Sequence, residues 1–358
     1  MESMVIDREF WRNRNVFLTG HTGFKGGWLS LWLQQLEAKV TGYALEPSTS
    51  PALYNLADVG KSMTSCFGDI RNFDLLKQSM WDAKPEVVIH FAAQPLVRPS
   101  YKDPIDTFSA NIMGTVHLLE AARLTPSVKA VLNITSDKCY ENQEWSWGYR
   151  ENDRMGGHDP YSCSKGCAEL VASSYRKSFF QEKQIGLASA RAGNVIGGGD
   201  WSADRIVPDA VQAFAAEKKL VLRNPMATRP WQHVLEPLAG YLLLSQCLYQ
   251  HPQQFSQGWN FGPHQEDACQ VSTLVEMIAE QWGQGAGWEQ DKETHPHEAG
   301  YLKLDCSKAT AELKWKPLWR LDRAVAETID WYQNAFSAKD MCAYTLQQIA
   351  TYQRELTA

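Results

Sequence analysis

The first half of the chain alternates short apolar runs with longer amphipathic segments. The apolar runs are continuous, as is typical of strands covered on both faces of a parallel sheet. They lie at 15–20, 39–45, 86–92, 129–135 and 184–191. Helix-length segments separate them, at 26–38, 72–83, 104–123 and 161–180. This alternation, with right-handed crossovers, predicts an α/β fold with a Rossmann-type doubly wound parallel sheet.

A glycine-rich loop joins the first strand to the first helix. Gly20, Gly23 and Gly26 have G-x-x-G-x-x-G spacing. A dinucleotide site needs such a loop, because the backbone must turn sharply and approach a pyrophosphate at a helix N-terminus. His21, Phe24 and Lys25 are therefore also candidate cofactor residues. His21 and Lys25 either add positive charge near the phosphates or are exposed loop residues.

The ends of the next strands supply the other candidate cofactor residues. An acid after the second strand binds the adenine ribose and disfavours a 2′-phosphate, and Glu46 is the nearest acid. This favours NAD over NADP. GDIRN places Asp69 and Ile70 at the end of a third strand, where a carboxylate can meet the adenine amino group. FAAQP places the small residues Ala92 and Ala93 where the cofactor crosses the sheet edge.

After about residue 195 the strand–helix alternation loosens. The segment GNVIGGGDWSAD (193–204) is rich in turn residues, and short runs with frequent Trp and Pro follow it. We therefore expect residues 1–194 to form the dinucleotide-binding domain, to which some later segments return. Residues 195–358 are expected to form mainly a smaller substrate-binding lobe.

Composition narrows the class of protein. The chain is 44% hydrophobic and 21% charged, with a net charge of -6, so nothing suggests a nucleic-acid or membrane partner. The charged N-terminus lacks the apolar stretch of a signal peptide, which predicts a cytoplasmic protein. The eight cysteines form no CxxC pair, so we expect reduced thiols and no metal site.

Three side chains form a candidate catalytic set. Tyr161 and Lys165 are spaced i, i+4 and project from one helix face. Ser136 ends the strand in NITSDKCY. A neighbouring ammonium and a cationic nicotinamide would lower the pKa of the tyrosine from its usual value near 10. Asn111 orients a water or the lysine, or else makes a structural bond to the backbone.

These motifs resemble the extended short-chain dehydrogenases/reductases, and within them the nucleotide-sugar 4,6-dehydratases. The likeness covers the glycine loop, NITSDKCY, PYSCSK, SARAGNVIGGGDW and RPWQHVLEPLAGYL. It implies NAD as cofactor and CDP-glucose as substrate, dehydrated to a 4-keto-6-deoxy sugar for deoxysugar and lipopolysaccharide O-antigen synthesis. A homodimer or tetramer through the helices at 104–123 and 161–180 is also expected.

The resemblance also implies a division of labour. Tyr161 takes the proton of the carbon-4 hydroxyl, supported by Lys165 and Ser136. Elimination of water across carbons 5 and 6 then needs a further acid and base. The broader family carries Asp–Glu at these positions, whereas this chain has Asp137–Lys138. Asp137 is the expected acid and Lys138 the expected base, unless Lys138 is only an ion-pair partner that positions Asp137.

Several residues of the second lobe are candidate substrate contacts. Asn194 matches a substrate-contacting Asn of the family, and Arg229 is the stronger diphosphate candidate because guanidinium binds phosphate bidentately. The remaining candidates are Arg98 near the sugar, Arg205 near the diphosphate or nucleotide, and Trp231 and Tyr301, which either stack on a base or belong to the core.

Other functions remain open at this point. One is a different sugar-nucleotide dehydratase, including a GDP-mannose type that uses NADP, or a 4-epimerase. A second, from another class, is a catalytically silent regulator that only binds the cofactor. The presence of Ser136, Tyr161 and Lys165 together argues against the regulator.

Overall fold

A seven-stranded parallel sheet forms the centre of the protein, in a computed structural model that describes residues 5–283, 285–291 and 301–357. The strand order is β10-β6-β5-β4-β1-β2-β3. The strands are β1 (Asn15–Thr19), β2 (Lys39–Ala44), β3 (Thr64–Phe67), β4 (Val87–His90), β5 (Ala130–Ile134), β6 (Gly186–Ala192) and β10 (Gly258–Phe261). This order and the crossovers confirm the predicted Rossmann-type fold.

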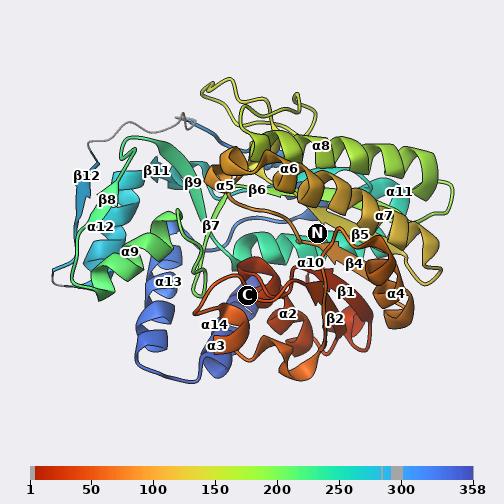
Figure 1. Ribbon diagram of the computed structural model, residues 1–358, viewed down its shortest axis with the longest axis horizontal. Helices are drawn as coiled ribbons and strands as arrows, with labels where there is room; N and C mark the ends of the chain where they lie inside the picture. The colour runs from red at the N-terminus through yellow and green to blue at the C-terminus, as the bar shows by residue number, and fades with distance from the viewer. Residues whose placement is uncertain (1–4, 284, 292–300, 358) are drawn as a thin grey trace.

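Helices cover both faces of this sheet (Figure 1). Alternate residues of each strand pack in opposite directions: Phe17 joins the core on one face of the sheet, whereas Val16 and Leu18 join the core on the other face. This two-sided burial explains why the strands are continuously apolar. The main helices are α2 (Phe24–Gln35), α4 (Phe73–Ala83), α7 (Gly114–Leu124), α8 (Pro160–Tyr175), α10 (Leu235–Gln250), α13 (Leu321–Phe336) and α14 (Met341–Leu356).

The predicted helix at 104–123 is not one regular helix. It begins as α6 (Pro104–Phe108), widens into a π-helical turn (Ser109–Met113) and continues as α7. α8 likewise passes into a π-helical turn at Arg176–Phe180. Such turns often mark functional positions, and the first of them carries Asn111.

Two small sheets and several helices form the second part of the molecule. β7 (Asn194–Ile196) and β11 (Ala268–Gln270) flank β9 (Thr228–His233), and β8 (Leu220–Leu222) pairs with β12 (Trp288–Gln290). Figure 1 shows β8, β12, α9 (Ile206–Ala215) and α12 (Val271–Trp282) at one end, away from the central sheet. The shorter helices are α1 (Arg8–Trp11), α3 (Leu53–Leu56), α5 (Val97–Lys102) and α11 (Pro252–Phe255).

Later segments also complete the first part of the molecule. β10 forms an edge of the central sheet beside β6, and α10 packs beneath β5 and β6. α14 packs on α2. The strand order reverses between β1 and β4, and ligands of doubly wound sheets bind at the carboxyl ends of strands at such a point.

Candidate active site

The glycine loop has the tight backbone that a dinucleotide site requires. Gly20 has φ +80°, and a Cβ there would lie 2.9 Å from the backbone nitrogen of Ala92 at the end of β4. A Cβ on Gly26 would lie 2.1 Å from the carbonyl oxygen of Gly20. Larger residues therefore cannot replace these glycines without moving the backbone. The loop opens α2, and the residues present fit a bound pyrophosphate at the helix N-terminus.

His21 neither adds positive charge near the phosphates nor lies exposed in the loop, so both alternatives expected for it are wrong. Its imidazole is 0% exposed and neither ring nitrogen has a hydrogen-bond partner among the described residues. Burial lowers the pKa of His21 to about 4, so the ring is neutral at physiological pH. The ring contacts Tyr54 and Phe67, and it fills the space where a side chain on Gly42 would lie.

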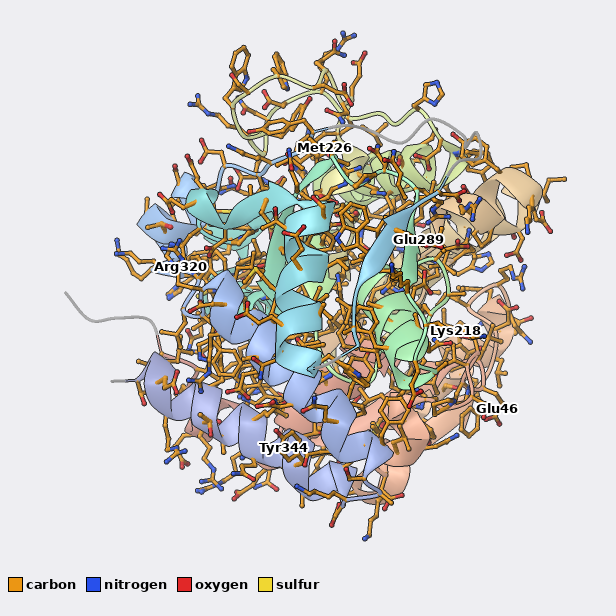
Figure 2. The ribbon with its side chains drawn as sticks, turned by 90° about the vertical axis from the view of Figure 1, so that its left-hand side faces the viewer. Glu46, Lys218, Met226, Glu289, Arg320 and Tyr344 are labelled. Carbon is orange, nitrogen blue, oxygen red and sulfur yellow. The ribbon has the colours of Figure 1, made fainter. Side chains whose placement is uncertain are left out.

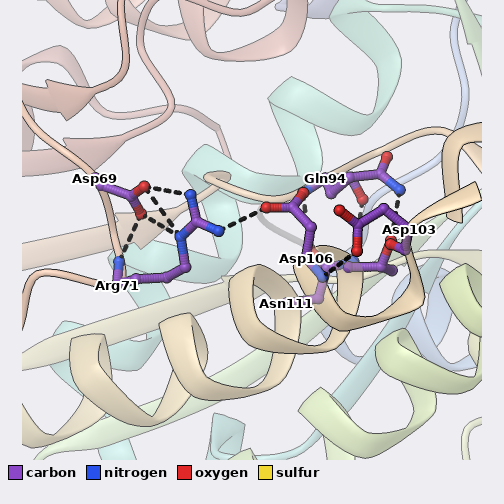
Figure 3. A network of polar contacts seen from close by, with 7 residues as sticks. Asp69, Arg71, Gln94, Asp103, Asp106 and Asn111 are labelled. Atoms are coloured by element: carbon purple, nitrogen blue, oxygen red, sulfur yellow. Dashed lines mark hydrogen bonds and ion pairs between the residues drawn. The ribbon is translucent and has the colours of Figure 1, made fainter.

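Glu46 and Asp69, the two expected contacts to the adenosine, have different surroundings in the structure. Glu46 is exposed, two residues beyond the end of β2, and lies at the rim of the molecule (Figure 2). The carboxylate of Asp69 is bound by Arg71, whose guanidinium also reaches Asp106 of α6 (Figure 3). This ion pair holds the pKa of Asp69 below its usual value. An adenine amino group at Asp69 would therefore have to compete with Arg71 for the carboxylate oxygens.

Asn111 has a structural role in this conformation. Its amide accepts a hydrogen bond from the Gln94 backbone nitrogen (2.8 Å) and donates to the Gln94 carbonyl (3.0 Å), and Figure 3 shows these two residues side by side. The same amide donates to the Ser164 hydroxyl (2.8 Å). The side chain is 3% exposed, so it fixes the loop after β4 to α8. That loop carries Ala92 and Ala93, which are half-buried, while Ile70 packs against Gly114.

Tyr161, Lys165 and Ser136 converge at the carboxyl end of β5. Ser136 follows the strand, and Tyr161 and Lys165 lie on the first turns of α8, which Asp159 caps. Burial raises the pKa of Tyr161 to about 12, and a hydrogen bond with Ser136 opposes this. Burial lowers the pKa of Lys165 to about 8. The Tyr161 phenol is therefore neutral at physiological pH, and a nicotinamide cation beside it would favour its ionisation.

Asp137 has the environment that an acid requires. It is 3% exposed and accepts a hydrogen bond from the Ser136 hydroxyl at 2.9 Å. Burial raises the pKa of Asp137, and the positive charge of Lys138 opposes the shift. A Cβ on Gly193 would lie 3.0 Å from the Asp137 carboxylate, so glycine leaves room for it. Lys138 is half-buried, and it lines a large cavity that Ser136, Asp137 and Tyr161 also line.

One cavity of about 1330 Å³ connects this catalytic set with the second lobe. Its volume exceeds the ~300–1,000 Å³ typical of a single small-molecule site. Asn194 and Trp231, which lie opposite each other on β7 and β9, both line it. The Asn194 amide nitrogen and the Trp231 indole nitrogen are buried without a hydrogen-bond partner among the described residues. Both are donors that a ligand oxygen would satisfy.

Four arginines line the same cavity, three of them expected from the sequence. These are Arg98, Arg205, Arg223 and Arg229. The loop before α9 supplies counter-ions: Asp200 pairs with Arg205 at 2.7 Å, and one oxygen of Asp204 accepts from both Arg98 (2.8 Å) and Arg223 (2.9 Å). The sequence did not predict Arg223, Asp200 or Asp204. The two aspartates lie in the turn-rich segment 193–204, which was the one feature of the sequence that could have indicated them.

Tyr301 does not line the cavity. Its hydroxyl donates to the carbonyl of Ser146, and its backbone bridges to Thr228. The predicted stacking of Tyr301 on a base therefore has no support in this conformation. Arg229 does line the cavity, and its guanidinium also donates to the Thr228 carbonyl at 3.0 Å.

The assembled groups suit oxidation, deprotonation and proton donation on one ligand. The Ser136 hydroxyl, the Tyr161 phenol, the Asp137 carboxyl and the Lys138 amine line the cavity together with the arginines. Lys165 is buried outside this lining and donates to the Ile134 carbonyl. Across residues 5–283, 285–291 and 301–357 there is no cluster of His, Cys, Asp and Glu that could hold a metal ion. No helix in these ranges is long and apolar enough to cross a bilayer.

Comparison with known proteins agrees with this chemistry. A family profile described as GDP-mannose 4,6 dehydratase matches residues 17–328. CDP-glucose 4,6-dehydratase of Salmonella typhimurium is 52% identical over 99% of this chain and 100% of its own length.

Solved structures show the same fold. A dTDP-glucose 4,6-dehydratase of Bacillus anthracis, in complex with NAD, superposes with a TM-score of 0.74 at 21% identity, covering 91% of this chain and 98% of its own. An epimerase of Methanothermobacter thermautotrophicus reaches 0.80 at 20% identity, covering 93% and 96%. The fold alone therefore does not separate dehydration from epimerisation.

Proposed function

Because the chain belongs to the GDP-mannose 4,6-dehydratase family, we propose that it dehydrates CDP-D-glucose to CDP-4-keto-6-deoxy-D-glucose with NAD as cofactor. The observation that carries the proposal is the Asp137–Lys138 pair beside Ser136 and Tyr161 in one cavity. An epimerase needs no such additional acid and base. The substrate named for the Salmonella typhimurium relative supports cytidine.

NAD fits the glycine loop. Gly20, Gly23 and Gly26 would hold its pyrophosphate, the loop carrying Ala92 and Ala93 would border its path, and Lys165 would contact the nicotinamide ribose. Bound NAD would accept the hydride of carbon 4 and return it to carbon 6, so the reaction involves no net oxidation. The NAD-bound dehydratase structure supports this choice of cofactor.

Tyr161 is the proposed base for the carbon-4 hydroxyl. Its phenol must lose a proton before it can accept one, and burial opposes this loss. The Ser136 hydrogen bond and the positive charge of Arg205 favour the phenolate, so Tyr161 would remove the hydroxyl proton as the hydride leaves carbon 4. Lys165, one helical turn further along α8, is the proposed second supporting cation. The product of this step is a 4-ketone, which acidifies the proton on carbon 5.

Asp137 and Lys138 are the proposed elimination pair. Lys138 accepts the carbon-5 proton in its neutral form, and Asp137 donates a proton to the departing carbon-6 hydroxyl, which leaves as water. Burial raises the pKa of Asp137, which favours the protonated form that this step requires. Lys138 returns its proton to carbon 5 as the hydride reaches carbon 6. Tyr161 then holds the proton of the carbon-4 hydroxyl and Asp137 lacks the one it gave to water, so loss of a proton from Tyr161 and uptake of one by Asp137 through solvent close the cycle.

The second lobe would bind the nucleotide diphosphate. Arg205, Arg223 and Arg229 line the same cavity as the catalytic residues. The Asn194 amide and the Trp231 indole, which lack a hydrogen-bond partner among the described residues, line it too. Guanidinium groups bind phosphate bidentately, and each arginine that pairs with an aspartate keeps further N–H donors.

Quaternary structure and cellular role are further proposals. Homodimerisation is supported by exposed apolar residues on the helices at 104–123 and 161–180, including Ile105 (81% exposed) and Leu170 (61% exposed). A role in deoxysugar synthesis for lipopolysaccharide, and a cytoplasmic location, would follow from the proposed product.

Turnover of the purified protein on CDP-, dTDP-, UDP- and GDP-hexoses, with and without added NAD⁺, tests the proposal. We expect a 4-keto product, detected by its absorbance in base, with CDP-glucose preferred. Formation of a C4 epimer instead of a 4-keto-6-deoxy product would overturn dehydration. The absence of turnover with every sugar nucleotide would favour a regulator that only binds the cofactor.

A further inference from the structure

Lys25 belongs to the cofactor loop and to the substrate cavity at once. It is the second residue of α2, between Gly23 and Gly26. Of the described residues that precede Pro95, only Lys25 lines the large cavity. Its side chain therefore extends from the pyrophosphate loop toward Asp137 and the second lobe, and the cofactor and substrate sites adjoin at this residue.

The ammonium of Lys25 has no carboxylate within ion-pair distance among the described residues. Burial and the cation of Arg205 lower the pKa of Lys25 to about 8, and the more distant Asp137 and Asp200 only partly oppose this. Arg205, by contrast, has Asp200 at 2.7 Å. A half-buried cation without a close counter-ion is costly unless a ligand supplies negative charge.

Two ligands of like charge would meet at this place. The cofactor carries a diphosphate for the glycine loop, and the sugar nucleotide carries a second diphosphate for the arginine-lined cavity. Negative groups in adjoining, partly desolvated sites repel each other. A positive charge placed between them offsets that repulsion only when both are bound.

We propose that Lys25 is a counter-ion shared by the two ligands, so that the cofactor and the sugar nucleotide each bind more tightly when the other is present. This proposal rests on the proposed function, because it assumes that both ligands bind. Coupling of this kind is reciprocal: each ligand must change the affinity for the other by the same factor.

Four dissociation constants measure this coupling without turnover. They are those of NADH with and without CDP, by nicotinamide fluorescence, and those of CDP with and without NADH, by calorimetry. In Lys25→Met we expect the coupling factor to fall by about tenfold, within the range typical of such coupling. The matched control is Lys39→Met, which removes an exposed lysine at the amino end of β2, the opposite edge of the sheet.

The pattern of constants decides the proposal. Lys25→Arg keeps the charge and should retain most of the coupling, and unchanged melting temperatures show that the variants fold. If Lys25→Met weakens the binding of NADH by the same factor with and without CDP, Lys25 contributes to cofactor binding alone and the proposal fails. An unchanged coupling factor also overturns it.

The wild-type protein separates this proposal from the proposed function. If CDP does not bind the wild-type protein but UDP or dTDP does, the nucleotide assignment is wrong. The same four constants measured with the nucleotide that binds then still test Lys25.

Discussion

Lys138 stands where the broader family is expected to carry a carboxylate, so its role can be separated chemically from that of Tyr161. Lys138→Ala should leave carbon-4 oxidation intact and block exchange of the carbon-5 proton, because only the second step needs this base. A single turnover in D₂O checks both steps: nicotinamide absorbance at 340 nm reports oxidation, and mass spectrometry reports deuterium at carbon 5. Carbon-5 exchange at the wild-type rate in Lys138→Ala would rule out Lys138 as the base.

Lys138→Arg distinguishes the base from an ion-pair partner. Arginine keeps the positive charge beside Asp137 but does not deprotonate in proteins. If Lys138 acts as the base, the arginine variant should lose exchange as the alanine variant does. Restored exchange in Lys138→Arg would show that Lys138 only positions Asp137.

At the scale of single residues, the sequence predicted which side chains come together better than it predicted their neighbours and charge states. Spacing predicted that Tyr161 and Ser136 lie at one helix face and one strand end, and the structure brings them together. Asp137 was a candidate only through the family resemblance, and its role stays a prediction. The neutrality of His21 and the ion pair between Asp69 and Arg71 were missed, because both depend on groups brought together by folding. Spacing along the chain does not show whether a side chain meets a counter-ion or apolar rings.

At the scale of elements, the π-helical turn before α7 connects the loop after β4 to α8, which carries Tyr161 and Lys165. Asn111→Ala would remove three hydrogen bonds from a buried site, two to Gln94 and one to Ser164. We expect a loss of about 2–4 kcal/mol in the free energy of unfolding, at ~1 kcal/mol for each bond. Weaker binding of NADH should accompany it, because the loop carrying Ala92 and Ala93 loosens. Urea unfolding and fluorescence titration measure the two effects.

Asn55→Ala is the control, since the Asn55 side chain is exposed. Its free energy of unfolding should change by less than about 0.5 kcal/mol. A loss as small as this in Asn111→Ala would contradict the structural role of Asn111.

The proposed dimer also belongs to this scale. Leu170→Glu on α8 should give a monomer, because a carboxylate would be buried without a partner in the helix–helix contact. Light scattering across a range of protein concentrations measures the mass. Met226→Glu is the control: Met226 is 65% exposed in the second lobe (Figure 2) and should leave the assembly unchanged. A dimeric Leu170→Glu would place the interface elsewhere.

Glu236 is a buried carboxyl group whose protonation makes the stability of the whole molecule depend on pH. Its carboxylate accepts hydrogen bonds from the backbone nitrogens of Leu318 and Trp319 and from the Tyr352 hydroxyl, which joins α10 to the C-terminal part of the chain. Burial raises the pKa of Glu236 to about 7 from its ordinary value of 4.5. The folded state therefore holds a proton that the unfolded chain has lost between these two pH values.

Stability should consequently decrease as pH rises from about 4.5 through 7. The shift corresponds to on the order of 3 kcal/mol, present below the unfolded pKa and lost above the folded one. Thermal unfolding of the wild-type protein and of Glu236→Gln between pH 5 and pH 8 tests this. The glutamine variant should lose less stability on going to pH 8, and parallel curves would show that Glu236 does not titrate.

The organisation of the whole molecule was only partly predictable. The five strands read from apolar runs all belong to the central sheet, because burial on both faces leaves a continuous pattern. The return of residues 258–261 as β10 was not apparent, since GWNF is too short to stand out. The cavity depends on pairs such as Arg98–Asp204, 106 residues apart in the chain, and no local pattern shows them.

The late position of β10 also has a consequence for synthesis on the ribosome. Until residues 258–261 have emerged, β6 is an edge strand, although all seven of its residues are buried in the finished protein. A nascent chain of some 250 residues therefore presents an apolar strand edge to other chains, as does any fragment that ends before residue 258. Such fragments would be natural clients of chaperones.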